Sequence, residues 1–406
     1  MKQLRELIAH ERSARPLLAA HLQSSLGTGA AYVALLVIAY ERFHSPLAVS
    51  TILLCEFLPA LMLGAVLGAA ADRWSRKTIL ICADVLRAGA FIGLALVDSF
   101  AATVALAALA GVGQAAFGPA VMASIPSLVS EQRLGAATAV YGAIGEFGYT
   151  VGPLLGAGAF ALIGASGVLL VNGITFGISA ALLATLTITR VAQEPGVRKP
   201  PLLSSARDGA RALRRNRAAW TVVVSSTFFV CFFGAMNVAE VILVNTTLDG
   251  GAAAYAITTA AMGLGVTGGA LLAARGESPE IGRRLYLGGI AIVGVGMAAC
   301  ALAPVLAVAV GAFFVIGIGN GIALTSENVL LQQLIPDEIK GRVFGLKGAM
   351  ISGAFLVSYC GGGLLVAAVG TRATFGVIAI GSLVVCLTAR TMLATDRRAA
   401  LTAVPA

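Results

Sequence analysis

The sequence predicts an all-α membrane protein with twelve transmembrane helices arranged in two six-helix halves. Of its 406 residues, 58% are apolar and only 12% are charged, and the mean hydropathy is +0.92. Water-soluble domains do not have this composition. Twelve apolar runs are long enough to cross a hydrocarbon core of about 30 Å, which takes roughly 20 helical residues. Helices are expected because every backbone polar group in lipid must be satisfied within the protein.

The predicted helices are joined by very short loops and are interrupted by one long polar stretch. Turns at 164–166, 303–304 and 370–371 are so short that the helices they join must be antiparallel neighbours. We therefore expect an N-terminal half at 1–190, a cytoplasmic linker at 191–217 and a C-terminal half at 218–406. The twelve predicted helices are residues 17–40, 47–71, 78–97, 100–126, 135–163, 166–189, 219–245, 252–274, 284–303, 305–328, 343–369 and 372–393.

The positive charges indicate the orientation in the membrane. The net charge is +9, and all Lys and Arg except Arg42, Arg87 and Arg372 fall at the termini, in the linker or in alternate loops. Because cytoplasmic loops are enriched in Lys and Arg, both termini are predicted to be cytoplasmic. This distribution accounts for the net positive charge, so no nucleic-acid partner is needed to explain it. The six cysteines all lie inside apolar runs without metal-ligand spacing, so we interpret them as small buried side chains.

The most informative stretch is the hairpin between the second and third predicted helices. Its glycines and charges are Gly64, Gly68, Asp72, Arg73, Arg76 and Lys77. They resemble the loop signature Gly-x-x-x-Asp-Arg-x-Gly-Arg-Lys of the major facilitator superfamily, with Ser75 where the family usually has glycine. The resemblance implies the major facilitator fold, with a substrate path between two halves related by a parallel repeat. A generic positive loop would not explain the aspartate or the glycines.

A second motif lies in the fifth predicted helix. Small residues at steps of four surround a proline at Gly148, Gly152, Pro153 and Gly156, with Ala157 next to the last glycine. They resemble the antiporter signature Gly-x-x-x-Gly-Pro-x-x-Gly-Gly of drug-exporting facilitators, which implies export. Pro153 removes one backbone hydrogen bond and bends the helix. We expect a smooth, bent surface at the contact between the halves; ordinary packing of small residues is the alternative.

Other segments resemble the secretion-effector branch of the superfamily, which includes enterobactin and macrolide exporters. They are residues 57–60, 84–88 and 117–120, and the second-half loop that contains Gly341 and Arg342. The resemblance implies a monomeric exporter of a drug, secondary metabolite or siderophore in the bacterial inner membrane, driven by proton antiport and without a cofactor. The family's arginine early in helix 4 has no match near Gln114. Coupling must then rest on other groups, or another ion must drive export.

Acidic residues inside spanning helices are costly and are therefore functional candidates. Glu56, Glu146 and Glu240 are the candidate proton or substrate sites. Glu56 is predicted to face the cavity between the halves. Asp84 lies one turn before Arg87, which indicates a structural ion pair.

Two other functions stay open at this point. One is a lysolipid or lipid-precursor flippase of the same fold, and the other is a membrane sensor that transports nothing. An enzyme is not indicated, because His10, His21 and His44 are not grouped and no nucleophile elbow, phosphate loop or metal-ligand spacing occurs. The expected partners are a small-molecule substrate, a proton or other coupling ion, and membrane lipid. An apolar substrate cavity is expected from Phe228, Phe229, Phe232, Phe233, Phe313 and Phe314, although these could equally face lipid or the core.

Overall fold

The computed structural model describes residues 10–73, 75–187, 210–211, 213–273, 278–335 and 337–402. These residues are almost entirely helical, and none of them forms a strand. Nine helical segments among them are long and apolar enough to cross a membrane. The predicted all-α membrane fold is confirmed at this level.

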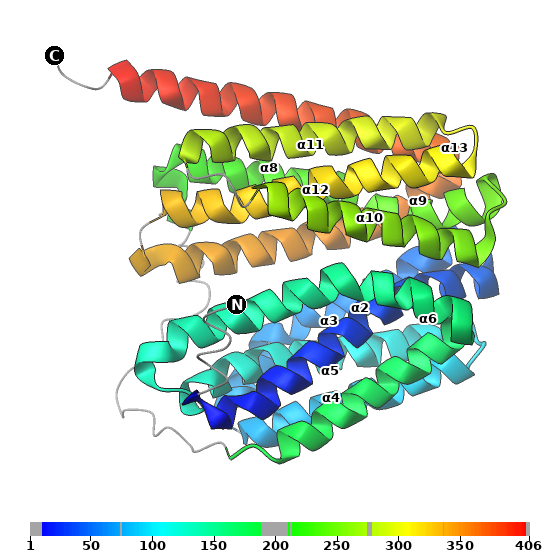
Figure 1. Cartoon of the computed structure of the whole chain (residues 1–406), viewed down its shortest axis with the longest axis vertical. Helices are drawn as coiled ribbons and strands as arrows, with labels where there is room; N and C mark the ends of the chain where they lie inside the picture. Colours follow the sequence, from blue (N-terminus) through cyan, green and yellow to red (C-terminus); the bar gives the residue numbers. More distant parts are fainter. Residues whose placement is uncertain are drawn as a thin grey trace. The chain divides into compact units, whose positions relative to one another are not determined.

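The internal contacts divide the chain into two compact units, Met1–Arg198 and Lys199–Ala406. The linker predicted at 191–217 lies largely outside the described residues, so its boundaries stay a prediction. The N-terminal unit contains the helices α2 (Arg15–Phe43), α3 (Pro46–Arg73), α4 (Arg76–Leu96), α5 (Phe100–Ser124) and α6 (Leu134–Ala184) (Figure 1). The C-terminal unit contains α8 (Arg217–Phe233), α9 (Ala235–Ile242), α10 (Gly251–Ala273), α11 (Pro279–Leu302), α12 (Leu306–Leu334) and α13 (Asp337–Thr402).

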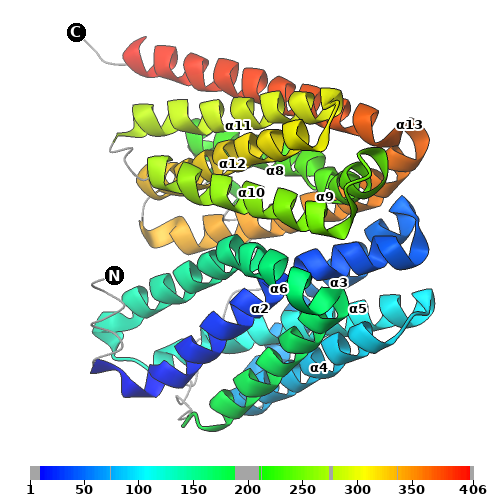
Figure 2. The ribbon, with the colours of Figure 1, turned by 45° about the vertical axis from the view of Figure 1, so that its right-hand side comes forward.

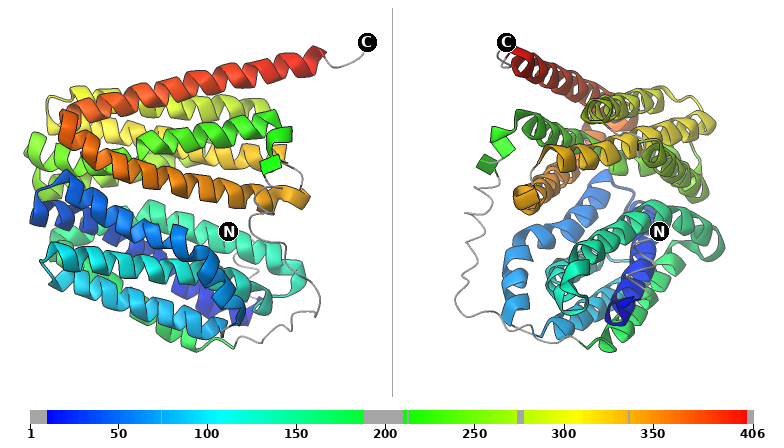
Figure 3. Two further views of the ribbon diagram at one scale, coloured as in Figure 1. Left: turned by 180° about the vertical axis from the view of Figure 1, so that it is seen from behind. Right: turned by 60° about the vertical axis from the view of Figure 1, so that its left-hand side comes forward.

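Two of these helices are too long for one crossing, and each reverses at a glycine. α6 has 51 residues and is interrupted at Gly164, where φ is 68° and ψ is 174°. α13 has 66 residues and is interrupted at Gly370, where φ is 80° and ψ is 169°. A positive φ is disfavoured for residues that carry a Cβ, so glycine suits both turns. Figure 3 shows the two arms of α13, drawn in orange and red, on either side of this turn.

The helices pack in the same order within each unit. In the N-terminal unit α2 packs on α6, α3 on α5, and α4 on both α5 and α6. In the C-terminal unit α8 and α9 pack on α13, α10 on α12, and α11 on both α12 and α13. Figure 2 shows α10 and α12 side by side. If α8 and α9 are counted together as the first helix of the C-terminal unit, the first three helices of each unit therefore pack against helices at corresponding positions.

Close glycine contacts repeat between the units in the same way. A Cβ on Gly111 of α5 would collide with the carbonyl oxygen of Glu56 on α3, and a Cβ on Gly317 of α12 would collide with that of Met262 on α10. Each helix pair thus approaches to backbone distance at its glycine, as small residues permit in membrane bundles.

Two arginines outside the basic clusters bind carbonyl oxygens at helix ends. Arg42 donates to the carbonyl oxygens of Leu94 (3.1 Å) and Val97 at the end of α4, and it pairs with Asp98 at 3.2 Å. Arg372 donates to the carbonyl oxygen of Ala301 in α11 (3.3 Å). A cation at a helix C-terminus meets unpaired carbonyls and the negative end of the helix dipole. These two exceptions to the charge pattern therefore have a local structural role.

The helix predicted at 219–245 is present as one apolar span, Arg217–Thr247, with an irregular turn at Gly234. α8 ends at Phe233 and α9 begins at Ala235, and a π-helical turn follows at Leu243–Thr247. A Cβ on the intervening Gly234 would lie 2.7 Å from Ser358 Oγ of α13, so this glycine permits a close approach of α13. The apolar pattern alone contains no signal for this contact.

The residues just before α2 form hydrogen bonds with the loop between α5 and α6. Glu11 Oε1 accepts hydrogen bonds from the Ser130 hydroxyl (2.7 Å), the Ser130 backbone N–H (3.2 Å) and Arg133 Nη1 (3.1 Å). The Ser130 hydroxyl and then its N–H are the main causes that hold the pKa of Glu11 below its usual range. This carboxylate joins the segment before α2 to the η3 turn Glu131–Arg133.

We expect Glu11→Gln to lower the melting temperature at neutral pH, because the charge-assisted bonds to Ser130 and Arg133 are weakened. The pKa of Glu11 is lower in the folded than in the unfolded chain, so its stabilisation is complete above the unfolded value and is lost as the pH falls through the folded value. Melting curves of both proteins over an acidic pH series test this. A difference that does not change with pH would contradict it, and Ser130→Ala in the Glu11→Gln background should add little.

Candidate functional site

The loop motif after α3 is partly described. Gly64, Gly68, Asp72 and Arg73 fall in the last part of α3, and their side-chain surroundings lie outside the described part of the chain. Ser75 is the N-cap of α4, and its hydroxyl accepts from the Thr78 N–H at 3.4 Å. Arg76 donates to the carbonyl oxygen of Ala123 (2.7 Å) at the end of α5. Ser75 thus supplies a helix cap where the family motif has glycine.

The glycines of the antiporter-type motif face α2 within the N-terminal unit. A Cβ on Gly148 would collide with Ser25, one on Gly152 would lie 2.7 Å from the Gly29 Cα, and one on Gly156 would lie 2.7 Å from the Ala30 Cα. The expectation that this small-residue surface lies between the halves is therefore wrong for the glycine face. Its physical role is to let α6 and α2 pack at backbone distance.

A related contact occurs in the C-terminal unit. A Cβ on Gly362 of α13 would lie 3.0 Å from the Ala235 Cα of α9. Gly362 thus approaches Ala235 as Gly152 approaches Gly29. The small-residue contact between first and fifth helices is present in both units.

Glu56 carries a buried carboxylate oxygen in the middle of α3. Its Oε2 is inaccessible to solvent and has no hydrogen-bond partner among the described residues. The backbone around it is tightly held, because Gly111 lies against its carbonyl oxygen. An ionised carboxylate without donors is costly to bury, whereas uptake of a proton removes the charge. Glu56 as a whole is half-buried, so this cost concerns the Oε2 side of its carboxylate.

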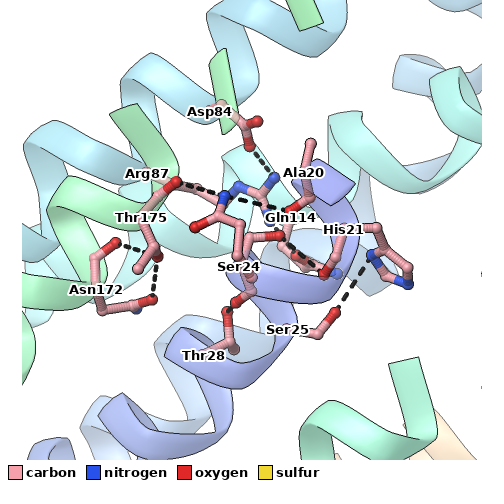
Figure 4. Close-up of polar contacts among 11 residues, drawn as sticks. Ala20, His21, Ser24, Ser25, Thr28, Asp84, Arg87, Gln114, Asn172 and Thr175 are labelled. Atoms are coloured by element: carbon pink, nitrogen blue, oxygen red, sulfur yellow. Dashed lines mark hydrogen bonds and ion pairs between the residues drawn. The ribbon is translucent and has the colours of Figure 1, made fainter. Parts of the chain in front are cut away.

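Asp84 and Arg87 are in contact one turn apart on α4. Arg87 Nη2 donates to Asp84 Oδ1, and Arg87 Nη1 donates to Gln114 Oε1 of α5 at 2.7 Å (Figure 4). The guanidinium lies between the rings of Phe117 and Phe176, 4.3 Å and 4.2 Å from their centroids. Charge pairing and two cation–π contacts hold this arginine in one orientation. The spacing of Asp84 and Arg87 indicated their pairing, whereas Gln114 could not be found from local spacing.

The other two acidic candidates are not brought together with Glu56 by any described contact. The side chain of Glu146, on α6, lies outside the described part of the chain. Glu240 is buried on α9, with 3% of its surface exposed, and it accepts from the Thr259 hydroxyl of α10 at 3.3 Å. Unlike Glu56, Glu240 therefore has a hydroxyl of a neighbouring helix within hydrogen-bond distance, and the single proton of that hydroxyl is shared with the Tyr255 carbonyl oxygen at 3.0 Å.

A second buried ion pair was not anticipated. Glu327 of α12 pairs with Lys347 of α13 at 2.9 Å, and Lys347 also donates to Asn328 Oδ1 at 2.9 Å. Glu327 is only 5% exposed. An acid and a cation in adjacent apolar helices were the available signal. The ion pair could not be predicted, because the two residues lie in different helices that are far apart in sequence.

The second-half loop adds no contact to the candidate site. Gly341 and Arg342 lie near the start of α13, and their side-chain surroundings lie outside the described part of the chain.

The phenylalanines predicted to line a substrate cavity differ in burial. Three of them, Phe229, Phe233 and Phe313, are buried. Phe228 and Phe314 are exposed, and a Cβ on Gly381 would touch the ring of Phe232. Phe229, Phe233 and Phe313 therefore pack within the C-terminal unit, and no contact among the described residues brings the six rings together at one site.

The described residues contain no group of three or more His, Cys, Asp or Glu side chains that could hold a metal ion. All six cysteines are free thiols. The groups described here are buried carboxylates, two buried ion pairs and hydrogen-bonding groups inside apolar helices.

Comparison with known proteins agrees with the interpretation as an all-helical membrane protein. The sequence model of the Major Facilitator Superfamily matches residues 17–277 and 280–405. The chain is 25% identical over 381 residues to the uncharacterized MFS-type transporter YfiS of Bacillus subtilis, with 91% of this chain and 90% of that protein covered. It is 22% identical to macrolide efflux protein A of Streptococcus pyogenes, covering 86% and 87%. It is 26% identical to the multidrug efflux pump Tap of Mycobacterium bovis, covering 90% and 89%.

A solved structure shows the same fold. The nucleoside transporter NupG superposes with a TM-score of 0.70 at 16% identity, covering 94% of this chain and 99% of that one. At this identity the likeness concerns the fold alone.

Proposed function

This chain belongs to the Major Facilitator Superfamily, and we propose that it exports a small amphipathic compound by alternating access, coupled to proton antiport. Its relatives include proteins named as macrolide and multidrug efflux pumps, which favours export of a drug, secondary metabolite or siderophore. We place it in the bacterial inner membrane as a monomer, with both termini cytoplasmic. Glu56 is the group that we assign to proton coupling.

The observation that carries proton coupling is the buried Oε2 of Glu56, which has no hydrogen-bond partner in the described part of the chain. An antiporter needs a group whose proton affinity differs between its two conformations, because a ligand shifts an equilibrium only by its differential affinity. A carboxylate with one buried oxygen that has no donor among the described residues meets that requirement if the other conformation admits water.

We further propose twelve membrane crossings. As one continuous helix, α6 with 51 residues would be about 77 Å long at 1.5 Å per residue, more than twice the hydrocarbon thickness of about 30 Å. α13, with 66 residues, is longer still. Counting each arm of α6 and α13 as one crossing, and α8, α9 and the π-helical turn together as another, gives six crossings in each unit.

This topology predicts which introduced cysteines an impermeant maleimide reaches. In a parent without native cysteines, Ser45→Cys and Asp249→Cys should be labelled in intact cells. Ser278→Cys, at the start of α11, should be labelled only after the cells are permeabilised. Labelling of Ser278→Cys from outside would overturn the orientation.

The function itself is tested in proteoliposomes. Flux of a panel of amphipathic compounds is measured with and without an imposed pH gradient, and gradient-dependent accumulation of at least one soluble compound is expected. The main alternative is a lysolipid or lipid-precursor flippase, which would instead move labelled lipid between leaflets. A sensor of the same fold would move neither. No flux of either kind would contradict the proposed transport.

A further inference from the structure

A polar cavity of about 70 Å³ lies inside the N-terminal unit, among α2, α4, α5 and α6. None of the acidic candidates lines it. α2 contributes His21, Ser24, Ser25 and Thr28, and α5 contributes Gln114 (Figure 4). The volume is enough for a few water molecules or for one small polar group of a larger ligand.

The hydroxyls on α2 present acceptors to this cavity. The Ser24 hydroxyl donates to the carbonyl oxygen of His21 at 3.3 Å, and the Thr28 hydroxyl donates to that of Ser24 at 2.8 Å. Each hydroxyl has one proton, and these bonds use it. The remaining lone pairs of both oxygens can therefore only accept.

The His21 ring fixes a third acceptor. Its Nε2 lies 3.1 Å from the carbonyl oxygen of Tyr141, and its ring stacks on the Tyr141 ring with centroids 3.7 Å apart. A carbonyl oxygen cannot donate, so Nε2 carries the hydrogen. In the neutral ring Nδ1 is then an acceptor, and it takes the Ser25 hydroxyl proton at 3.3 Å. Ser25 Oγ, like Ser24 and Thr28, is left with accepting capacity only.

The side of the cavity formed by α5 supplies donors. Arg87 has no acceptor atom, so the atom of Gln114 that faces it at 2.7 Å is the amide oxygen. The Gln114 NH₂ group is thereby directed away from Arg87 with two donors. Gln114 is exposed, whereas Arg87 behind it is 5% exposed, so the amide lies at the mouth of the cavity.

We propose that this cavity binds an uncharged end of the substrate that both donates and accepts hydrogen bonds, such as a primary amide or a hydroxyl. This inference rests on the export function proposed above. Such a group would accept from Gln114 and donate to the α2 oxygens. A carboxylate would meet the lone pairs of Ser24, Ser25 and Thr28. The charge of Arg87 in the lining is already paired with Asp84, so it is not available to a carboxylate. A cation would find no Asp or Glu in the lining to pair with.

The test uses two fluorescent probes with the same naphthyl body, one ending in a primary amide and the other in a primary ammonium. Binding to the full-length protein in lipid nanodiscs is measured by fluorescence anisotropy, without any ion gradient. The parent should bind the amide probe more tightly. Gln114→Leu should weaken amide binding by about tenfold, because the partner groups lose their donor, and should leave ammonium binding nearly unchanged. Gln114→Glu should shift the preference toward the ammonium probe.

Gln332→Leu is the matched control, because Gln332 is an exposed glutamine on α12 of the other unit and should not affect binding of either probe. Equal affinity of the parent for the two probes, no amide binding at all, or unchanged amide affinity in Gln114→Leu would each overturn the proposal. Gln114→Glu keeps an oxygen toward Arg87, so it serves if Gln114→Leu does not fold. Selective amide binding without gradient-driven flux would contradict only the proposed export. Flux without amide selectivity would contradict only this inference.

Discussion

Glu56→Gln abolishes export driven by a pH gradient if Glu56 is the coupling group. Glutamine keeps the size and polarity of the side chain but cannot gain or lose a proton, so the gradient no longer biases the conformational cycle. In proteoliposomes, gradient-driven flux should fall to the level of protein-free liposomes. Glu56→Asp, which retains a carboxyl group, should be partly active.

Substrate counterflow separates lost coupling from a misfolded protein. Exchange of labelled for unlabelled neutral substrate needs no net proton movement, so Glu56→Gln should still perform it. Glu280→Gln, at an exposed acid in the first turn of α11, is the matched control and should keep gradient-driven flux. If Glu56→Gln responds to the gradient like the parent, Glu56 is not the coupling site and Glu146 becomes the next candidate.

Gly152→Leu should prevent α2 and α6 from packing. Even a Cβ at this position would lie 2.7 Å from the Gly29 Cα and 2.8 Å from the Leu26 carbonyl oxygen, and backbone atoms cannot turn away as a side chain can. Overpacking of this kind costs about 3 kcal/mol or more, which corresponds to a fall in melting temperature of roughly 5–10 °C. Melting temperature and the monodisperse yield after size exclusion measure the effect.

The same helix offers a control with the opposite environment. Among the described residues, no atom outside the helix's own nearby backbone lies within 4 Å of a Cβ added at Gly158. Gly158→Leu should therefore leave the melting temperature unchanged or raise it slightly, since leucine favours helix over glycine. Equal loss of stability in both variants would contradict the prediction. It would show that the cost of a larger side chain on α6 does not come from the contact with α2.

Features that depend on neighbours in sequence could be predicted. The apolar runs gave the helices, and the short turn at 164–166 appears as a reversal at Gly164. Asp84 and Arg87 are one helical turn apart, so their spacing alone suggested the contact that the structure contains. In such cases chain geometry restricts the partners to a few residues.

Features that depend on packing between distant segments could not be predicted. Glu327 and Lys347 belong to different helices, and only the packing of α12 near α13 makes them partners. The glycine stripe was expected at the contact between the halves, whereas it packs on α2 within the N-terminal unit. Its partner could not be predicted, because small residues fit any helix equally well. The cavity beside Gln114 combines side chains from four helices, and no spacing in the sequence brings them together.

The single-glycine turns at Gly164 and Gly370 also constrain how this gene can change in length. Where a helix reverses within one residue, no loop remains to absorb an insertion or a deletion. One residue added within an arm rotates all later side chains of that arm by about 100° about the helix axis. The packing of α6 and α13 is therefore tied to an exact count of residues on each side of the turn. Epitope tags and reporter domains belong at sites such as residues 44–45, which join α2 to α3 outside either helix.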